Sequence, residues 1–162
     1  MSKRGGRGGV MVGLMAGLLL GGPTLFAGQV TGKYIGNGKA ANLAHAVVMP
    51  HDPWKDQPAY VIVLSEKDPA TSKNPDTDAM FGKLGDALTV TVTKSGDIFG
   101  TQVCHQALKK AGFSTTGSLF VEGFKIEAGS LSGRFFTRKT EEFFGDTWEV
   151  DVTVKAALPA GK

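Results

Sequence analysis

Five charged residues that could take part in chemistry lie in one polar, proline-bearing segment directly after a short apolar run: Glu66, Lys67, Asp68, Asp76 and Asp78. Loops that follow strands are common places for binding and catalytic sites. We therefore take these residues as a candidate ligand-binding, acid–base or cation site. The same residues could instead form a solvated loop with a helix cap and a local ion pair.

The spacing Asn74-x-Asp76-x-Asp78 is that of the oxygen ligands at the start of a calcium loop. The pattern fails further on, because the sixth position is Ala79 instead of glycine and the twelfth is Gly85 instead of glutamate. Pro75 favours the start of a helix in this segment.

A transition-metal site is the alternative chemistry, since imidazole and thiolate suit copper or zinc. His45, His105 and Cys104 would be the ligands, with loop carboxylates, and the protein would then be a redox or hydrolytic one. Cys104 and His105 are adjacent, however, and adjacent residues of a strand point to opposite faces. One site could use both only if a bulge turned one of them. A buried thiol with unrelated histidines is the other interpretation.

No motif for nucleophilic catalysis or phosphate binding is present: the chain has no Gly-x-Ser-x-Gly elbow and no phosphate loop. Cys104 would be reactive only as an exposed thiol of lowered pKa. We therefore expect a binding protein more than an enzyme, with no cofactor. Phe143 and Phe144, in an acidic connection, are a candidate surface patch for a partner.

The elements that must position these residues are mainly strands, because apolar and polar residues alternate along most of the chain. We predict eight strands, at residues 30–35, 41–49, 60–64, 88–93, 98–105, 118–126, 131–137 and 147–154. One short helix is predicted at residues 75–84, with Met80, Phe81 and Leu84 on its apolar face. Strands joined by tight turns predict a single mainly-β domain, an antiparallel sandwich or barrel.

Local signals refine this arrangement. Asn37-Gly38 predicts a hairpin turn, which would pair residues 30–35 with a return strand at 41–49 whose Leu43, His45, Val47 and Met49 share a face. Residues 50–58, with two prolines, are predicted as a loop. The apolar phase slips at Glu122-Gly123, which predicts a β-bulge.

The first 27 residues have the order of a signal peptide: a basic stretch, an apolar run at residues 10–20, and a turn-prone region before Ala27. The apolar run is shorter than the roughly 20 residues of a membrane-spanning helix. We therefore expect cleavage after Ala27, export to the periplasm or the extracellular space, and no stable membrane anchor afterwards. A retained anchor is the alternative.

Cleavage would change the charge of the protein. Lys3, Arg4 and Arg7 account for the net +3, since removing them from 18 basic residues leaves 15 against 15 acidic ones. The near-neutral remainder of 135 residues (162 less 27) lacks the basic footprint of a nucleic-acid binder. Cys104, the single cysteine, has no partner for an internal disulfide.

The expected role is therefore an exported, non-enzymatic binding module for a partner protein, an envelope component or a small ligand. Two structural features would separate these choices. A pocket between the 65–86 segment and the sheet would favour a small ligand, whereas a flat apolar patch would favour a protein partner.

Overall fold

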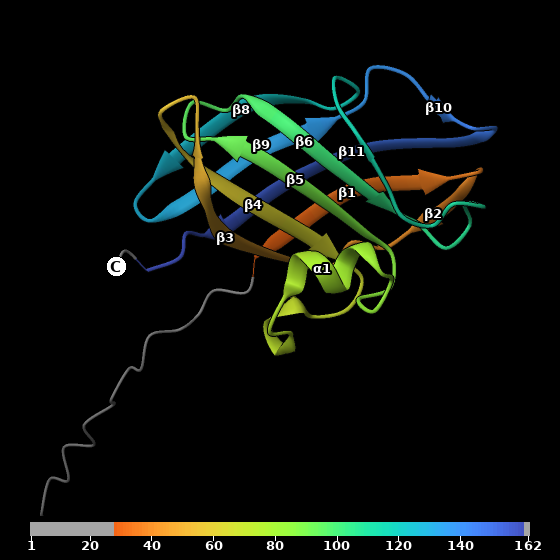
Figure 1. Cartoon of the computed structure of the whole chain (residues 1–162), viewed down its shortest axis with the longest axis horizontal. Coiled ribbons are helices and arrows are strands. Elements are labelled where there is room, and N and C mark those ends of the chain that lie inside the picture. Colours follow the sequence, from red (N-terminus) through yellow and green to blue (C-terminus); the bar gives the residue numbers. More distant parts are fainter. Residues whose placement is uncertain (1–27, 161–162) are drawn as a thin grey trace, which may run out of the picture.

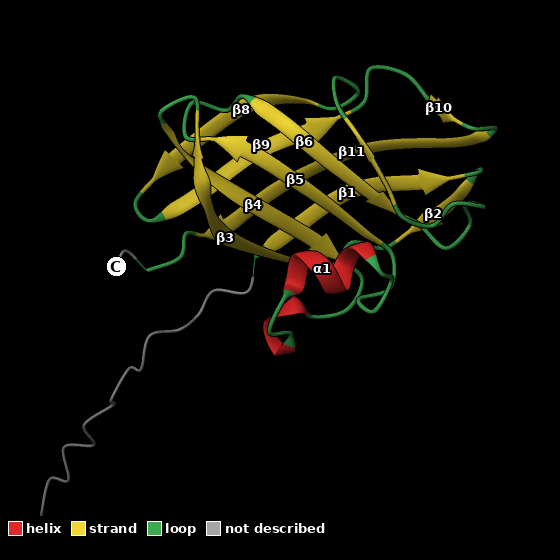
Figure 2. Ribbon diagram, in the orientation of Figure 1, coloured by secondary structure: helices red, strands yellow, loops and turns green. Residues whose placement is uncertain are grey.

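Two antiparallel sheets packed face to face form the domain in the computed structural model, which describes residues 28–160 (Figure 1). The signal-peptide prediction falls on residues outside this range. Strands make up nearly all of the domain, and the helical turns gather at one end of it (Figure 2). The sheets do not close into a barrel, so the sandwich is the alternative that holds.

The first sheet has six strands, in the order β2-β1-β11-β9-β8 with β10 paired to β11. Its strands are β1 (Gln29–Gly36), β2 (Lys39–Ala41), β8 (Phe120–Glu127), β9 (Ser130–Phe136), β10 (Glu141–Phe143) and β11 (Asp146–Ala157). The predicted bulge is confirmed, because the β8–β9 register shifts between Glu122 and Lys125. Gly123 there has a φ of +62°, which glycine adopts without strain.

The second sheet has five strands in sequence order, β3-β4-β5-β6-β7. They are β3 (His45–Trp54), β4 (Gln57–Ser65), β5 (Ala87–Thr93), β6 (Ile98–Cys104) and β7 (Phe113–Thr115). The eight predicted strands all have a counterpart, and the three additional ones (β2, β7 and β10) are three residues long. Runs this short carry too little alternation to be recognised from sequence.

The predicted return strand at 41–49 is wrong in part. The Asn37-Gly38 turn does form a hairpin, but β2 ends at Ala41 and the chain then crosses to the other sheet, where β3 begins at His45. Leu43 is consequently buried in the central core, whereas Val47 and Met49 pack on the outer side of the second sheet. Leu43 therefore does not share the predicted face, because it lies in the crossing between β2 and β3, whereas His45, Val47 and Met49 are alternate residues of β3 and lie on one face.

The predicted loop at 50–58 is also wrong, since β3 and β4 continue into a tight hairpin. Lys55 and Asp56 form its turn with φ values of +49° and +61°, the paired positive values of a type I′ hairpin turn. Pro50 and Pro53 are tolerated because β3 is the edge strand of its sheet, where a missing backbone donor breaks no ladder bond.

The 65–86 segment carries a 3₁₀ turn, η1 (Pro69–Thr71), and the helix α1 (Pro75–Met80). Asn74 and Pro75 begin α1 as predicted, but it ends four residues earlier than expected, before Gly82 at a φ of +72°. Phe81 is 67% exposed, so its predicted place on the apolar face is wrong, whereas Leu84 is buried as predicted, together with Ala79. The segment lies against the outer face of the second sheet (Figure 1).

The core fills the space between the two sheets. Alternate residues of β5 and β11 face inward as predicted, with Leu88, Val90 and Val92 opposite Trp148, Val150, Val152 and Val154, all at most 2% exposed. A second, smaller cluster lies on the other side of the second sheet, under α1: Val61, Val63, Ala79, Leu84, Ala87 and Cys104. No helix within residues 28–160 is long and apolar enough to cross a membrane.

Candidate functional site

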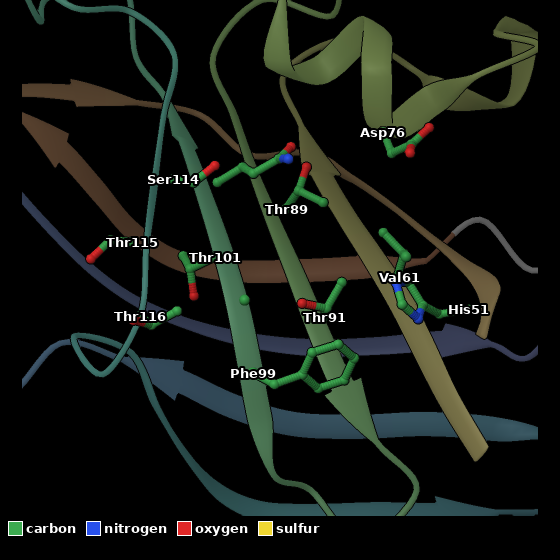
Figure 3. A pocket seen from close by; sticks show the side chains of 12 residues that line it. His51, Val61, Asp76, Thr89, Thr91, Phe99, Thr101, Ser114, Thr115 and Thr116 are labelled. Atoms are coloured by element: carbon green, nitrogen blue, oxygen red, sulfur yellow. The ribbon is translucent and has the colours of Figure 1, made fainter. Parts of the chain in front are cut away.

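A groove of about 450 Å³ crosses the outer face of the second sheet beside α1, and we call it the polar groove. In Figure 3, Thr89 and Thr91 of β5 lie at its centre, Ser114 and Thr115 of β7 on one side, and His51 and Asp76 on the other. The remaining residues of the lining are Val61, Phe99, Gly100, Thr101, Gln102 and Thr116. Pockets of this size are typical of small-molecule sites.

A β-bulge brings Phe99 to one end of the groove. Gly100 pairs with Thr91 and Ile98 pairs with Val92, so Phe99 is the extra residue between two consecutive pairs. Such a bulge leaves one residue outside the ladder and redirects its side chain. Phe99 is thus freed from the alternation of β6 and contributes its ring to the groove (Figure 3).

A second bulge, in β3, brings two further rings to Phe99. The β3–β4 register shifts between His51 and Trp54. The Trp54 ring stacks on the Phe99 ring at a centroid distance of 4.6 Å and an interplanar angle of 1°. His51 meets the Phe99 ring edge to face, with centroids 5.4 Å apart. We call Phe99, Trp54 and His51 the ring cluster. Contacts with Trp54 and His51 hold the Phe99 side chain in place.

The floor of the groove depends on a close approach at Gly100. A Cβ atom at this position would come into collision with the Thr91 hydroxyl oxygen. Glycine is therefore needed here for Thr91 to lie over the neighbouring strand. The Thr91 side chain lines the groove, where a ligand can reach its hydroxyl.

The polar side chains of the groove have free hydrogen-bonding capacity. Within residues 28–160, the side chains of Thr89, Thr91, Gln102 and Ser114 donate or accept no intramolecular hydrogen bond, unlike Thr115, which pairs with Ser118 at 3.3 Å. Hydroxyl and amide groups that are held in place and unpaired are available to a polar ligand. Their position along one groove makes it a candidate binding surface.

The charge of the groove is low. Asp76 is the one acidic residue of the lining, and none of the lining residues is Lys or Arg. A groove without fixed cations has no means to compensate the charge of a phosphate or carboxylate ligand. The chemistry of the surface therefore disfavours an anionic ligand.

The five charged residues predicted as one site are not brought together. Asp76 lines the polar groove, whereas Asp68 lines a different hollow. Asp68 also accepts a hydrogen bond from the Ala70 amide at 2.9 Å and so caps η1. Asp78 accepts from Ser72 Oγ at 2.6 Å and from Lys83 Nζ at 2.8 Å. These bonds, the one from Lys83 foremost, lower the pKa of Asp78.

Glu66 and Lys67 hold the ends of the 65–86 segment together. Glu66 accepts a hydrogen bond from the Asp86 amide at 3.3 Å, and the Lys67 amide donates to the Leu84 carbonyl at 3.0 Å. Gly85 is packed against the Glu66 side chain at a φ of +75°. These contacts fit the second interpretation of Glu66 and Lys67, in which they belong to a structural loop and not to a binding or acid–base site.

Cys104 is the last residue of β6 and His105 follows it, and their side chains lie on opposite sides of the second sheet. Cys104 is buried in the cluster under α1. Burial, and secondarily the charge of Asp86, raise the pKa of its thiol, which disfavours the reactive thiolate. Neither bulge turns the two side chains toward one another.

His105 is 2% exposed and packs edge-on against the Tyr34 ring, with centroids 5.0 Å apart. Its Nδ1 accepts from the Ala107 amide at 3.1 Å, and its buried Nε2 has no hydrogen-bond partner within residues 28–160. The nearest carboxylate oxygen of Asp86 is 4.0 Å from Nδ1, too far for a hydrogen bond.

His45 lies apart from His105, in a hollow of about 390 Å³ that it lines with Asp68, Pro69 and Leu158. Among the described residues, no three His, Cys, Asp or Glu side chains come together in a way that could hold a metal ion. The arrangement of His45, His105 and Cys104 thus offers separate single ligands and no shared site.

Of the Phe143 and Phe144 pair, only Phe144 is largely exposed. Phe143 stacks on Phe113 at a centroid distance of 3.9 Å, which ties it to the core through Trp148. Phe144 is 78% exposed, and Lys110 Nζ lies 4.6 Å from the centre of its ring. One aromatic ring at a turn is a small surface, not a flat apolar patch.

The ring cluster and the threonines of the groove are the features that the sequence did not single out. Thr89 and Thr91 lie on the outer face of β5, as alternation with the inward Leu88, Val90 and Val92 requires, but nothing local in the sequence shows that α1 and β7 flank them. The adjacent Ile98 and Phe99, two large apolar residues in succession within an alternating strand, were the available signal for the bulge.

Comparison with protein-family models, with curated proteins and with solved structures found no match to this chain.

Proposed function

We propose that this protein is an exported, non-enzymatic binding domain that holds a small polar ligand in the polar groove. The observation that carries this proposal is the position and chemistry of the groove. It lies on the outer face of the second sheet beside the 65–86 segment, which contributes Asp76, and Thr89, Thr91, Gln102 and Ser114 offer unpaired polar groups to it. A rigid sheet that presents oriented polar groups is a suitable scaffold for binding.

A protein partner is less well supported by the surface. The large apolar side chains exposed among residues 28–160 are Trp54, Phe81 and Phe144. They belong to three different elements: β3, the end of α1 and the β10–β11 turn. Separate single residues of this kind are normal on a protein surface.

Amide chemical-shift mapping by NMR tests the proposal. A set of small fragments, comprising neutral polyols, organic anions, amines and aromatic compounds, is titrated into the purified protein. We expect at least one class to shift the amides of β5, β6 and β7 around Thr91. Shifts at another surface alone, or none with any class, would contradict the proposal.

A groove-filling variant makes the test specific. Ser114 is exposed on the edge strand β7 and lines the groove, so Ser114→Trp should block binding without disturbing the core. Thr153→Trp is the matched control, because Thr153 is an exposed strand residue of the other sheet. Binding that survives Ser114→Trp, or that is equally lost in Thr153→Trp, would argue against the groove.

The metal alternative has its own measurement. Metal content is determined on protein purified from its native compartment without a histidine tag. The proposal predicts less than one equivalent of copper or zinc, whereas a stoichiometric metal would favour the alternative. Fractionation of the producing cells tests export, and recovery of uncleaved protein in the cytoplasm would contradict that part of the proposal.

A further inference from the structure

We infer that the ligand of the polar groove is a neutral sugar. The ring of the sugar would stack on the ring cluster, and its hydroxyl groups would form hydrogen bonds with Thr89 and Thr91 at the base of the groove. This inference rests on the proposed function and names the chemical class of its ligand. A sugar ring has two kinds of surface: hydroxyl groups around its edge, and a face of C–H groups that is apolar. The groove offers a counterpart to each.

The apolar counterpart is Phe99. Trp54 covers one face of the Phe99 ring, parallel within 1° and with centroids 4.6 Å apart. Phe99 also lines the groove, so the part of its ring that Trp54 and His51 leave uncovered is the part available there. A ring held by its neighbours loses little conformational entropy when a ligand packs on it. Phe99 is therefore prepared to receive the C–H face of a sugar.

The polar counterpart is the set of hydroxyl and amide side chains at the base and along the sides of the groove. Thr89, Thr91 and Ser114 each combine a donor with an acceptor, and Gln102 supplies both kinds of group through its amide. Sugar hydroxyls likewise donate and accept, so each contact can form in either direction. A ligand that only accepted or only donated would leave half of this capacity unused.

Asp76 completes the match on the side opposite β7 (Figure 3). Its carboxylate has no hydrogen-bond or ion-pair partner within residues 28–160. The two oxygens of a carboxylate can accept from two neighbouring hydroxyl groups at once. Asp76 also repels anions, and the lining has no Lys or Arg to offset it, so sugar phosphates and nucleotides are disfavoured.

A peptide is a poorer fit than a sugar. An extended peptide gains affinity by pairing its backbone with the edge of a sheet. The polar groove instead runs over the face of β4, β5 and β6, whose backbone groups are already paired within the sheet, and the edge strand that it reaches, β7, is only three residues long. Side-chain hydroxyls above a sheet recognise other hydroxyls, not an unpaired backbone.

The inference is tested with defined probes by NMR titration of the purified protein. The methyl β-glycosides of glucose, galactose and N-acetylglucosamine are compared with sorbitol, which has hydroxyl groups but no ring face, and with glucose 6-phosphate. We expect at least one glycoside to bind with a Kd of about 1 mM, as suits an open groove. Sorbitol and glucose 6-phosphate should each bind at least tenfold more weakly.

Variants then separate stacking from hydrogen bonding. Phe99→Ala should weaken glycoside binding about tenfold or more, and Phe99→Trp should retain it. Thr91→Val, which keeps the shape and removes the hydroxyl, should weaken binding several-fold. Phe144→Ala is the matched control, since Phe144 is an exposed ring away from the groove. Melting temperatures of all variants are measured, so that a loss of folding is not taken for a loss of contact.

The outcomes of these titrations distinguish a failure of the sugar inference from a failure of the proposed function. Groove shifts with non-sugar fragments alone would overturn the sugar inference and leave the proposed function standing. Groove shifts with none of the compounds would overturn both. Equal binding of sorbitol, tighter binding of glucose 6-phosphate, or unchanged affinity in Phe99→Ala at intact stability would each overturn the inference.

Discussion

Replacement of Trp148 by alanine tests whether the last strand faces the core as both its alternation and its packing indicate. Trp148 is 2% exposed and lies edge-on against Phe113, with centroids 6.2 Å apart. A tryptophan of this kind buries about 150–250 Å², which corresponds to about 4–6 kcal/mol at roughly 25 cal/mol per Å². Since alanine keeps the Cβ atom, we expect Trp148→Ala to cost about 3–5 kcal/mol.

This loss is large compared with the total stability of a domain, which is about 5–15 kcal/mol. For a domain of this size, it corresponds to a fall in Tm of roughly 10–20 °C. The measurement is urea unfolding followed by far-UV circular dichroism, with calorimetry as a second readout. The midpoint should fall while the slope of the free energy against urea stays constant, as expected when stability alone changes.

Trp54→Ala is the matched control, because Trp54 is the other tryptophan and is 43% exposed. Its stacking on Phe99 is worth about 0.5–1.5 kcal/mol, so the control should cost no more than this. If Trp148→Ala does not fold, Trp148→Phe, which keeps a ring, should still fold at a cost of about 1–2 kcal/mol. A loss under about 1 kcal/mol for Trp148→Ala, or a larger loss for Trp54→Ala, would refute the assignment of the inner face.

Three further predictions concern the ends of the sheets. Gly36→Ala should destabilise the protein by about 1–3 kcal/mol, because a Cβ atom would lie 2.6 Å from the His105 ring; the loss should be smaller in an His105→Ala background, and equal losses in thermal melts would contradict the contact. Hydrogen bonds, the one from Asn37 foremost, lower the pKa of the buried Asp146. Such a carboxylate stabilises the fold above its unfolded pKa of about 3.9 and loses this effect as pH falls, so the gap between wild type and Asp146→Asn in urea unfolding should shrink on acidification; a gap independent of pH would contradict this. The Cys104 thiol, buried and of raised pKa, should react with a disulfide reagent far more slowly in the native protein than in denaturant, and equal rates would show that it is accessible.

Several parts of the fold could be predicted from the sequence because their signals are local. Alternation along β5 and β11 identified the inner faces, since side chains of a strand point to opposite sides in turn. Asn37-Gly38 identified a hairpin, and the phase slip at Glu122-Gly123 identified a bulge. Both signals are local, because a turn or a bulge requires particular backbone conformations of only a few residues. Asn74 and Pro75 likewise marked the start of α1.

Other parts depended on which elements meet. The crossing between β2 and β3, which separates Leu43 from Val47, follows from sheet pairing and leaves no local mark. Pro50 and Pro53 suggested a loop because prolines interrupt a strand, yet an edge strand accepts them. Phe81 fitted a helical face, but α1 ended earlier and left it in solvent.

The candidate site shows the same division. The residue types of the site are visible in the sequence: threonines that alternate outward on β5, an aspartate in the first turn of a helix, and two large apolar residues in succession at Ile98-Phe99. The sequence by itself determined that Thr89 and Thr91 leave the core, because apolar periodicity assigns the other face of β5 to it. Only the tertiary structure decided that Asp76, Thr91 and Phe99 surround one groove, while Asp68, His45 and Cys104 lie elsewhere. The reason is that periodicity is a property of one strand, whereas a site is set by the order of strands in a sheet and by the packing of a helix across it.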